Sequence, residues 1–221
     1  MSDRSPVSLV DQAYELLRSE ILDCTIAPGS QVTERSLASS YGFGLSAVRS
    51  ALVRLASENL LTAVPRVGYT VAPITLRGVG EFFEAWEILG PALVRLAAAR
   101  MTDEQREQLM SHKVPGANAT PQELVAYATA TWDIVVDAAD NAVLADLYRR
   151  LAGDMYRIFT LVWRSDTRST MQSLGMPPML SSTPEEAEQL TRAYIRESRA
   201  RVTEFLLAST SLAHTSVSFP F

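Results

Sequence analysis

Five arginines between residues 33 and 77 could bind anionic groups. They are Arg35, Arg49, Arg54, Arg66 and Arg77. Only Glu34 and Glu58 oppose them in this segment, so its net charge is five minus two, or +3, although the whole chain has a formal net charge of −5. A guanidinium fork matches both a phosphate and the acceptor edge of guanine, so a local basic excess favours nucleic-acid binding. On charge alone, an ordinary solvated surface is an equally good interpretation.

Residues suited to catalysis or metal binding are few. The chain has two histidines, His112 in a predicted loop and His214 near the C-terminus, so no Ser/His/Asp arrangement is expected. Asp133, Asp137 and Asp140 fall on one side of a predicted helix, opposite its apolar stripe, which is typical of a solvated face. We therefore do not expect an enzyme.

Composition favours a cytoplasmic protein. Hydrophobic residues make up 47% of the chain, enough for a packed core, but no apolar run approaches the ~20 residues that cross a bilayer. Cys24 is the single cysteine, which excludes an intrachain disulfide. Residues 1–6 lack the charged and then apolar pattern of a signal peptide. We expect no membrane partner.

The five arginines fall within a series of short predicted elements. Apolar periodicity and turn residues predict helices over residues 8–24, 34–41 and 45–58, and strands over residues 61–64 and 69–72. A tight turn at 42–44 separates the second and third helices, and residues 65–68 form a hairpin tip. This order is typical of a winged helix-turn-helix, predicted over residues 7–73, whose helix after the tight turn enters the major groove.

The rest of the chain is predicted to be helical. Apolar stripes at helical spacing begin at Phe82, Leu124, Leu144 and Leu190. Residues 74–77 are expected to form a linker, residues 78–208 an antiparallel helical bundle, and residues 209–221 a loose tail. The predicted fold class is therefore mainly α, with an N-terminal winged helix-turn-helix followed by an all-α bundle.

Both halves of the chain resemble a known family of bacterial regulators. The stretch LLRSEILDCTIAPGSQVTERSLASSYGFGLSAVRSALVRLASENLL, followed by PRVGYTV, is similar to the N-terminal domain of GntR-type regulators. The segments LGPALVRLAA, DNAVLADLYRRL and PEEAEQLTRAYIRESRARVTEFL resemble the helical effector domain of the FCD-type branch. The resemblance implies a DNA-binding transcriptional regulator.

The resemblance also implies which residues contact DNA. Arg35 is expected to bind a phosphate or a base edge, and Arg49 to bind a guanine from the recognition helix. Ser46 stands where the family usually has Thr and is expected to donate to a phosphate. Gly68 is expected to let the wing approach the groove closely, with Arg66 inserting beside it.

The start of the recognition helix departs from the family pattern. The family commonly has Ser and Arg where this chain has Gly44 and Leu45. An N-cap side chain and a base-contacting arginine are therefore both missing. Leu45 is expected either to contact a thymine methyl group or to make no DNA contact, and the operator is expected to differ from the common one.

The FCD resemblance implies an effector pocket, but its usual metal ligands are missing. Many such domains hold a metal through one Asp and three His, whereas this chain has two His in all. Those positions, and that of an Arg that binds carboxylates, hold Trp86, Ala128, Trp132, Gln172 and Tyr194. We expect no metal or other cofactor, and an aromatic, largely neutral pocket for an apolar or aromatic effector. The alternative is that these side chains fill the pocket as core.

The predicted function is that of a transcriptional regulator, expected to act as a repressor, that binds a double-stranded DNA operator as a homodimer. A small effector in the helical domain would change operator affinity. The alternative is a constitutive DNA-binding dimer whose effector pocket is filled and vestigial.

Overall fold

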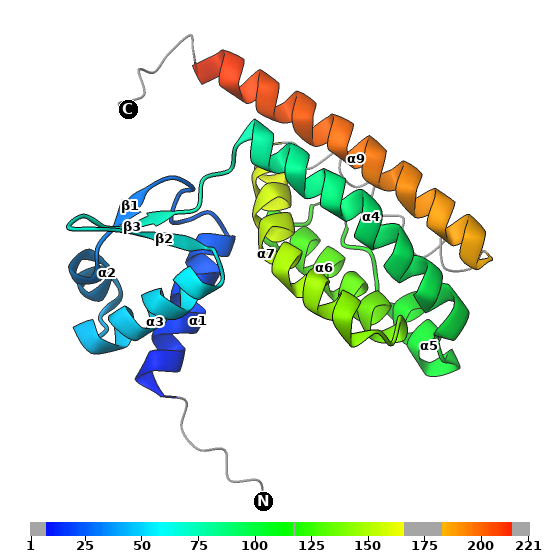
Figure 1. The fold of residues 1–221 in the computed structure, drawn as a ribbon, viewed down its shortest axis with the longest axis horizontal. Coiled ribbons are helices and arrows are strands. Elements are labelled where there is room, and N and C mark those ends of the chain that lie inside the picture. Colours follow the sequence, from blue (N-terminus) through cyan, green and yellow to red (C-terminus); the bar gives the residue numbers. More distant parts are fainter. Residues whose placement is uncertain (1–7, 117, 166–182, 214–221) are drawn as a thin grey trace, which may run out of the picture. The chain divides into compact units, whose positions relative to one another are not determined.

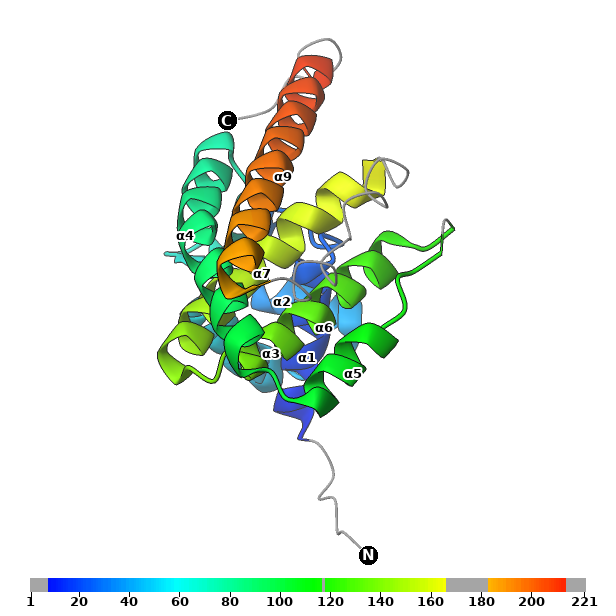
Figure 2. The ribbon, with the colours of Figure 1, turned by 90° about the vertical axis from the view of Figure 1, so that its right-hand side faces the viewer.

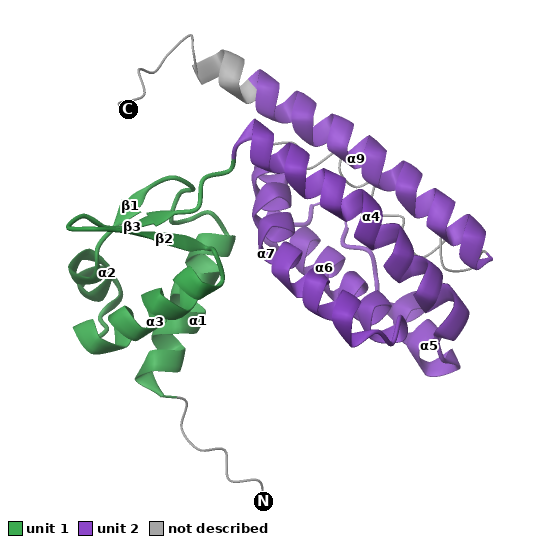
Figure 3. Ribbon diagram, viewed as in Figure 1, with its two compact units in different colours: residues 1–74 green, residues 75–221 purple. Residues whose placement is uncertain are grey.

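The structure, a computed structural model, describes residues 8–116, 118–165 and 183–213. The chain divides into two compact units between Ile74 and Thr75 (Figure 3). Within the described residues, unit 1 contains short helices and a small sheet, and unit 2 consists of helices, most of which are longer (Figure 1). The predicted fold class, a winged helix-turn-helix followed by a helical domain, is confirmed.

The elements of unit 1 follow one another in the predicted order, with one addition. They are α1 (Leu9–Leu22), β1 (Gln31–Val32), α2 (Glu34–Tyr41), α3 (Leu45–Ser57), β2 (Leu61–Val64) and β3 (Gly68–Val71). The addition is β1, which pairs antiparallel with β3 and gives the sheet the order β1-β3-β2. A two-residue strand is too short to show the alternation that predicts strands from a sequence.

Caps and glycines fix the turn between α2 and α3. Thr33 and Ser36 form a capping box at the start of α2. α2 ends at Gly42, whose left-handed backbone (φ 73°) costs a glycine little. α3 begins after Gly44, which provides no side-chain cap. The tight turn predicted from these glycines is therefore present.

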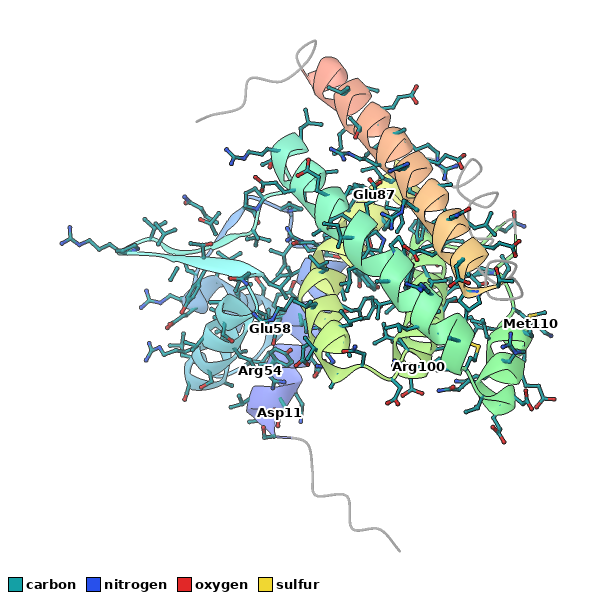
Figure 4. The ribbon with its side chains drawn as sticks, turned by 45° about the vertical axis from the view of Figure 1, so that its right-hand side comes forward. Asp11, Arg54, Glu58, Glu87, Arg100 and Met110 are labelled. Carbon is teal, nitrogen blue, oxygen red and sulfur yellow. The ribbon has the colours of Figure 1, made fainter. Side chains whose placement is uncertain are left out.

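Arg54 contributes to the contact between α1 and α3. Its guanidinium lies 3.5 Å from the ring centroid of Tyr14. Its nitrogens also lie 3.5 Å from Asp11 Oδ1 and 3.9 Å from Glu58 Oε1 (Figure 4). The Tyr14 hydroxyl in turn donates to Glu58 Oε1 at 2.6 Å. The charge of Arg54 is thus engaged within unit 1.

In its described residues, unit 2 contains the helices that the apolar stripes predict, and one that they do not. They are α4 (Leu76–Arg100), α5 (Asp103–Ser111), α6 (Pro121–Ala138), α7 (Ala142–Ser165) and α9 (Pro184–Ala213). The sequence does not predict α5, because Leu109 is the one residue that this helix buries and a helix without a buried stripe shows no periodicity.

Two boundaries in unit 2 differ from those expected. α4 begins inside the expected linker 74–77, because the Thr75 hydroxyl accepts from the Gly78 N–H and caps the helix there. α9 continues to Ala213, past the expected end of the bundle at residue 208. No glycine or proline occurs between residues 209 and 213 to end the helix earlier.

α4 and α9 run side by side in opposite directions (Figures 1 and 2). An ion pair between Glu87 and Arg196 lies at the edge of this contact. Gly90 lies in its core, where an added Cβ would stand 2.7 Å from Ile195 Cδ1. Glycine therefore lets the two helices approach closely at this point. Among the described residues, no helix is long and apolar enough to cross a lipid bilayer.

Candidate DNA interface and bundle pocket

α3 has one buried and one open face, and the residues of this helix predicted to contact DNA lie on the open face. The buried face includes Val48, Leu52 and Leu55. Leu45 is 48% exposed, and Ser46 and Arg49 are exposed as well. Arg35 of α2 is also exposed. The spacing of three and four residues brings Leu45, Ser46 and Arg49 onto one side of the helix.

Glu34, the first residue of α2, binds the guanidinium of Arg49. Nε of Arg49 lies 3.0 Å from each carboxylate oxygen of Glu34, and Nη2 lies 2.8 Å from Oε2. The Arg49 side chain remains 66% exposed, whereas that of Glu34 is 27% exposed. A bidentate ion pair thus joins α2 and α3 at the arginine that is predicted to bind guanine.

The ion pair shifts the pKa values of both partners. Hydrogen bonding to Arg49 lowers the pKa of the Glu34 carboxyl. The hydrogen bonds and charge of Glu34 raise the pKa of Arg49, and the nearby Tyr69 hydroxyl of β3 contributes in the same direction. Both partners are therefore fully charged at neutral pH.

The wing is the hairpin of β2 and β3. Arg66 is exposed at its tip, with a φ of 65°. Gly68 has a φ of 128°, and an added Cβ would stand 2.4 Å from the carbonyl oxygen of Val32 in β1. Packing within unit 1 thus excludes a side chain at position 68, independently of any approach to DNA.

Glu34 and Tyr69 belong to the surface around Arg49, although sequence reasoning does not single them out. Glu34 lies 15 positions before Arg49 on another helix, so no local spacing predicts their contact. Both residues do lie inside the stretch that resembles the GntR family, next to Arg35 and Gly68. Their position beside these predicted DNA-contacting residues is the sequence signal that could have pointed to Glu34 and Tyr69.

Most of the residues predicted for an effector pocket line one cavity in unit 2. They are Trp86 of α4, Ala128 and Trp132 of α6, and Tyr194 of α9. Gln172 lies outside the described residues. Trp86 and Trp132 are 3% and 4% exposed, and their ring centroids lie 4.5 Å apart in an edge-to-face arrangement. The two rings thus form one continuous aromatic side of the cavity.

Other residues of this cavity are missed by sequence reasoning, because they do not differ from ordinary core residues. They include Phe83, Phe159, Trp163 and Ser198. The cavity measures about 30 Å³, room for one or two water molecules. Burial raises the pKa of the Tyr194 hydroxyl, and a hydrogen bond with Ser198 partly offsets this. Tyr194 is therefore protonated at neutral pH and can donate a hydrogen bond.

The side chains around the cavity do not fit a divalent metal. The indole of Trp132, the phenol of Tyr194 and the methyl group of Ala128 stand where the FCD resemblance implies imidazole and carboxylate ligands. In the part of the chain that the structure describes, no group of three or more His, Cys, Asp or Glu side chains could hold a metal ion. His112 stacks on Tyr127 with ring centroids 4.8 Å apart, and His214 lies outside the described residues.

Two family models match the chain, one in each unit. The model of the bacterial regulatory proteins of the gntR family matches residues 9–71. The model of the FCD domain matches residues 81–208.

Individual transcriptional regulators also match the chain. The HTH-type transcriptional repressor GlaR of Escherichia coli K12 is 25% identical over 205 residues, which cover 87% of this chain and 88% of GlaR. The HTH-type transcriptional repressor RspR of the same organism is 32% identical over 100 residues, less than half of either protein (44% and 43%).

Solved structures share the fold. Escherichia coli McbR/YncC superimposes with a TM-score of 0.70 at 17% identity, over 94% of this chain and 99% of that one. A transcriptional regulator GntR from Rhodococcus sp. RHA1 has a TM-score of 0.69 at 15% identity, over 89% and 98%. At these identities the likeness concerns the fold alone.

Proposed function

Because the chain belongs to the GntR family of bacterial regulatory proteins and carries an FCD domain, we propose that unit 1 binds a double-stranded DNA operator and represses transcription. The observation that carries this proposal is the open face of α3, from which Arg49 projects 66% exposed while the opposite face is core. The match to the repressor GlaR over 88% of that protein's length supports repression rather than activation.

In the proposed complex, α3 enters the major groove and Arg49 binds a guanine. Arg35 and Ser46 donate to phosphates, and Arg66 at the wing tip reaches the neighbouring groove. The first turn of α3 lacks a side-chain cap, so its backbone N–H groups are free of one competitor for phosphate. Two copies of the chain bind two half-sites related by a two-fold axis.

Selection from a random duplex library tests this function. The full chain should enrich one sequence with two related half-sites. Arg49→Ala should lower the affinity for that duplex roughly tenfold or more at fixed salt. Arg150→Ala removes the same charge from an exposed position of α7 and should leave affinity unchanged. Equal affinities of the wild type and Arg49→Ala, or no enriched sequence, would contradict the proposal.

For unit 2, we propose an uncharged apolar or aromatic effector that binds without a metal among the cavity's rings. Trp86, Trp132 and Phe83 supply apolar contacts, and the Tyr194 hydroxyl supplies a hydrogen-bond donor. A ligand larger than the present cavity must displace side chains. That displacement is the event that would be coupled to operator affinity.

The small size of the cavity favours a second candidate, a constitutive DNA-binding dimer with a filled pocket. Ligand pockets usually enclose about 300–1,000 Å³, whereas this cavity measures about 30 Å³. Thermal unfolding with uncharged aromatic and aliphatic compounds separates the two candidates. A compound that raises the midpoint of the wild type but not of Trp132→Leu favours the effector. If no compound does so, the result favours the constitutive dimer.

Stoichiometric zinc or nickel in the purified protein would contradict a metal-free pocket.

A further inference from the structure

We propose that Glu34 is a positioning residue for base recognition: its carboxylate occupies one edge of the Arg49 guanidinium and directs the other edge toward a guanine. This role rests on the proposed function, in which Arg49 binds a guanine. Glu34 would then influence base specificity without touching DNA itself.

The geometry of the ion pair distinguishes the two edges of Arg49. The guanidinium has five N–H donors in a fixed plane. Glu34 binds the side edge, with Nε 3.0 Å from each carboxylate oxygen and Nη2 2.8 Å from Oε2. The end edge consists of Nη1 and the outward hydrogen of Nη2, and Nη1 makes no hydrogen bond to Glu34. Two parallel donors on this edge match the O6 and N7 acceptors of guanine.

Glu34 is itself held in place. It is the first residue of α2, where the helix dipole favours a carboxylate. The capping box of Thr33 and Ser36 fixes the chain directly before it. The wing strand packs closely here as well, since an added Cβ on Gly68 would lie 3.4 Å from the Thr33 Cα. Arg49 therefore loses less conformational freedom when it binds a base.

The same ion pair weakens Arg49 as a general phosphate anchor. The pair joins one positive and one negative group 2.8 Å apart. As a whole it carries no net charge. Non-specific DNA affinity grows with the number of phosphates that protein cations neutralise. Removing the Glu34 carboxylate should therefore strengthen non-specific binding and weaken base discrimination. A residue that merely supported the fold would weaken both when removed.

The test compares Glu34→Gln with the wild type on three kinds of duplex. They are the duplex that the wild type selects, variants of it with each guanine replaced in turn by adenine, and an alternating A·T duplex without guanine. In Glu34→Gln, affinity for the A·T duplex should rise severalfold at low salt, and its logarithm should fall more steeply with log salt, by about 0.9. The affinity ratio between the selected duplex and its most discriminated variant should fall roughly tenfold.

Two controls keep the result interpretable. Glu15→Gln removes the same charge from an exposed position of α1 and should leave the affinity ratio unchanged. In an Arg49→Ala background, Glu34→Gln should no longer change that ratio, because there is no arginine left to position.

Several results would overturn the positioning role. An unchanged ratio in Glu34→Gln would do so while leaving DNA binding by the wild type intact. A wild type that selects no sequence would instead refute the proposed function. Weaker binding to all three kinds of duplex, together with a lower thermal midpoint, would assign Glu34 a purely structural role. A change of the ratio in the Arg49→Ala background would mean that Glu34 contacts DNA directly.

Discussion

Leu45 opens the recognition helix with 48% of its surface exposed. Together with Gly44 it leaves the first turn of α3 with neither a cation nor a side-chain cap. Glu34 neutralises Arg49 a turn later. In the proposed complex, this helix would therefore offer DNA less positive charge than its arginines suggest, and shape and backbone donors would contribute more to the contact.

A cation introduced at residue 45 should tighten DNA binding. Leu45→Arg costs little core packing, and the new charge lies at the turn that faces the groove in the proposed complex. Its binding constant should fall more steeply with salt than that of the wild type, by about 0.9 in log–log slope. Fluorescence anisotropy titrations at several salt concentrations measure this. Ile88→Arg, at a 73% exposed position of α4, is the matched control, and an equal steepening there would argue against the docking.

At the level of single residues, the sequence predicts which side chains are exposed better than it predicts which other side chains they contact. The helical period places Leu45, Ser46 and Arg49 on the open side of α3. The family resemblance includes both Arg49 and Arg54, and nothing in their spacing separates them. In the structure, Arg49 projects from the open face while Arg54 packs on Tyr14 of α1. Such pairings depend on how helices meet, which no local pattern contains.

The contact between α4 and α9 depends on one glycine of α4, Gly90. Gly90 is buried, and an added Cβ would stand 2.7 Å from Ile195 Cδ1 and 3.4 Å from Trp86. Glycine inside a helix costs about 0.5–1 kcal/mol relative to alanine. The close approach of the two helices is therefore expected to offset that cost.

This balance predicts that the effect of a substitution at Gly90 depends on the side chain at residue 195. Gly90→Ala alone should lower the free energy of unfolding by about 1 kcal/mol or more, because the new methyl group overpacks the contact. In an Ile195→Val background, which lacks Cδ1, the same change should instead stabilise the protein by about 0.5–1 kcal/mol. Urea unfolding followed by circular dichroism measures both values. Equal effects in the two backgrounds would show that Ile195 is not the obstacle.

At the level of elements, periodicity predicts the helices that bury a broad stripe and fails elsewhere. α3 and α6 match their stripes closely. Leu147 of α7 and Leu190 of α9, however, are 46% and 47% exposed, because a stripe predicts which residues share a face but not how much of that face a neighbour covers. β1 and α5 bury too little to show a pattern at all.

Over the whole molecule, burial raises the pKa of tyrosines in both units. They are Tyr14, Tyr41, Tyr127, Tyr148 and Tyr194. Tyr148 is 3% exposed, and the charge of Asp133 adds to the effect of its burial. A raised pKa means that the folded protein holds these protons more tightly than the unfolded chain does.

The contribution of these tyrosines to stability should therefore be constant below the ordinary tyrosine pKa of about 10 and fall above it, as the unfolded chain loses protons first. A single group contributes up to about 1.4 kcal/mol per pH unit in that range. Tyr148→Phe keeps the ring and removes the titrating group, so its free energy of unfolding should fall less steeply between pH 10 and 11. Urea unfolding at a series of alkaline pH values measures the slopes. Identical slopes for the two proteins would contradict this assignment.

The aromatic cavity also has a spectroscopic consequence. The chain contains three tryptophans, and Trp86, Trp132 and Trp163 all line this one cavity. The DNA-binding unit contains none. Intrinsic tryptophan emission therefore reports on the cavity alone, without a label, while DNA titrations leave unit 1 optically silent at these wavelengths. A shift of that emission when an operator duplex binds would be a direct optical record of communication between the two units.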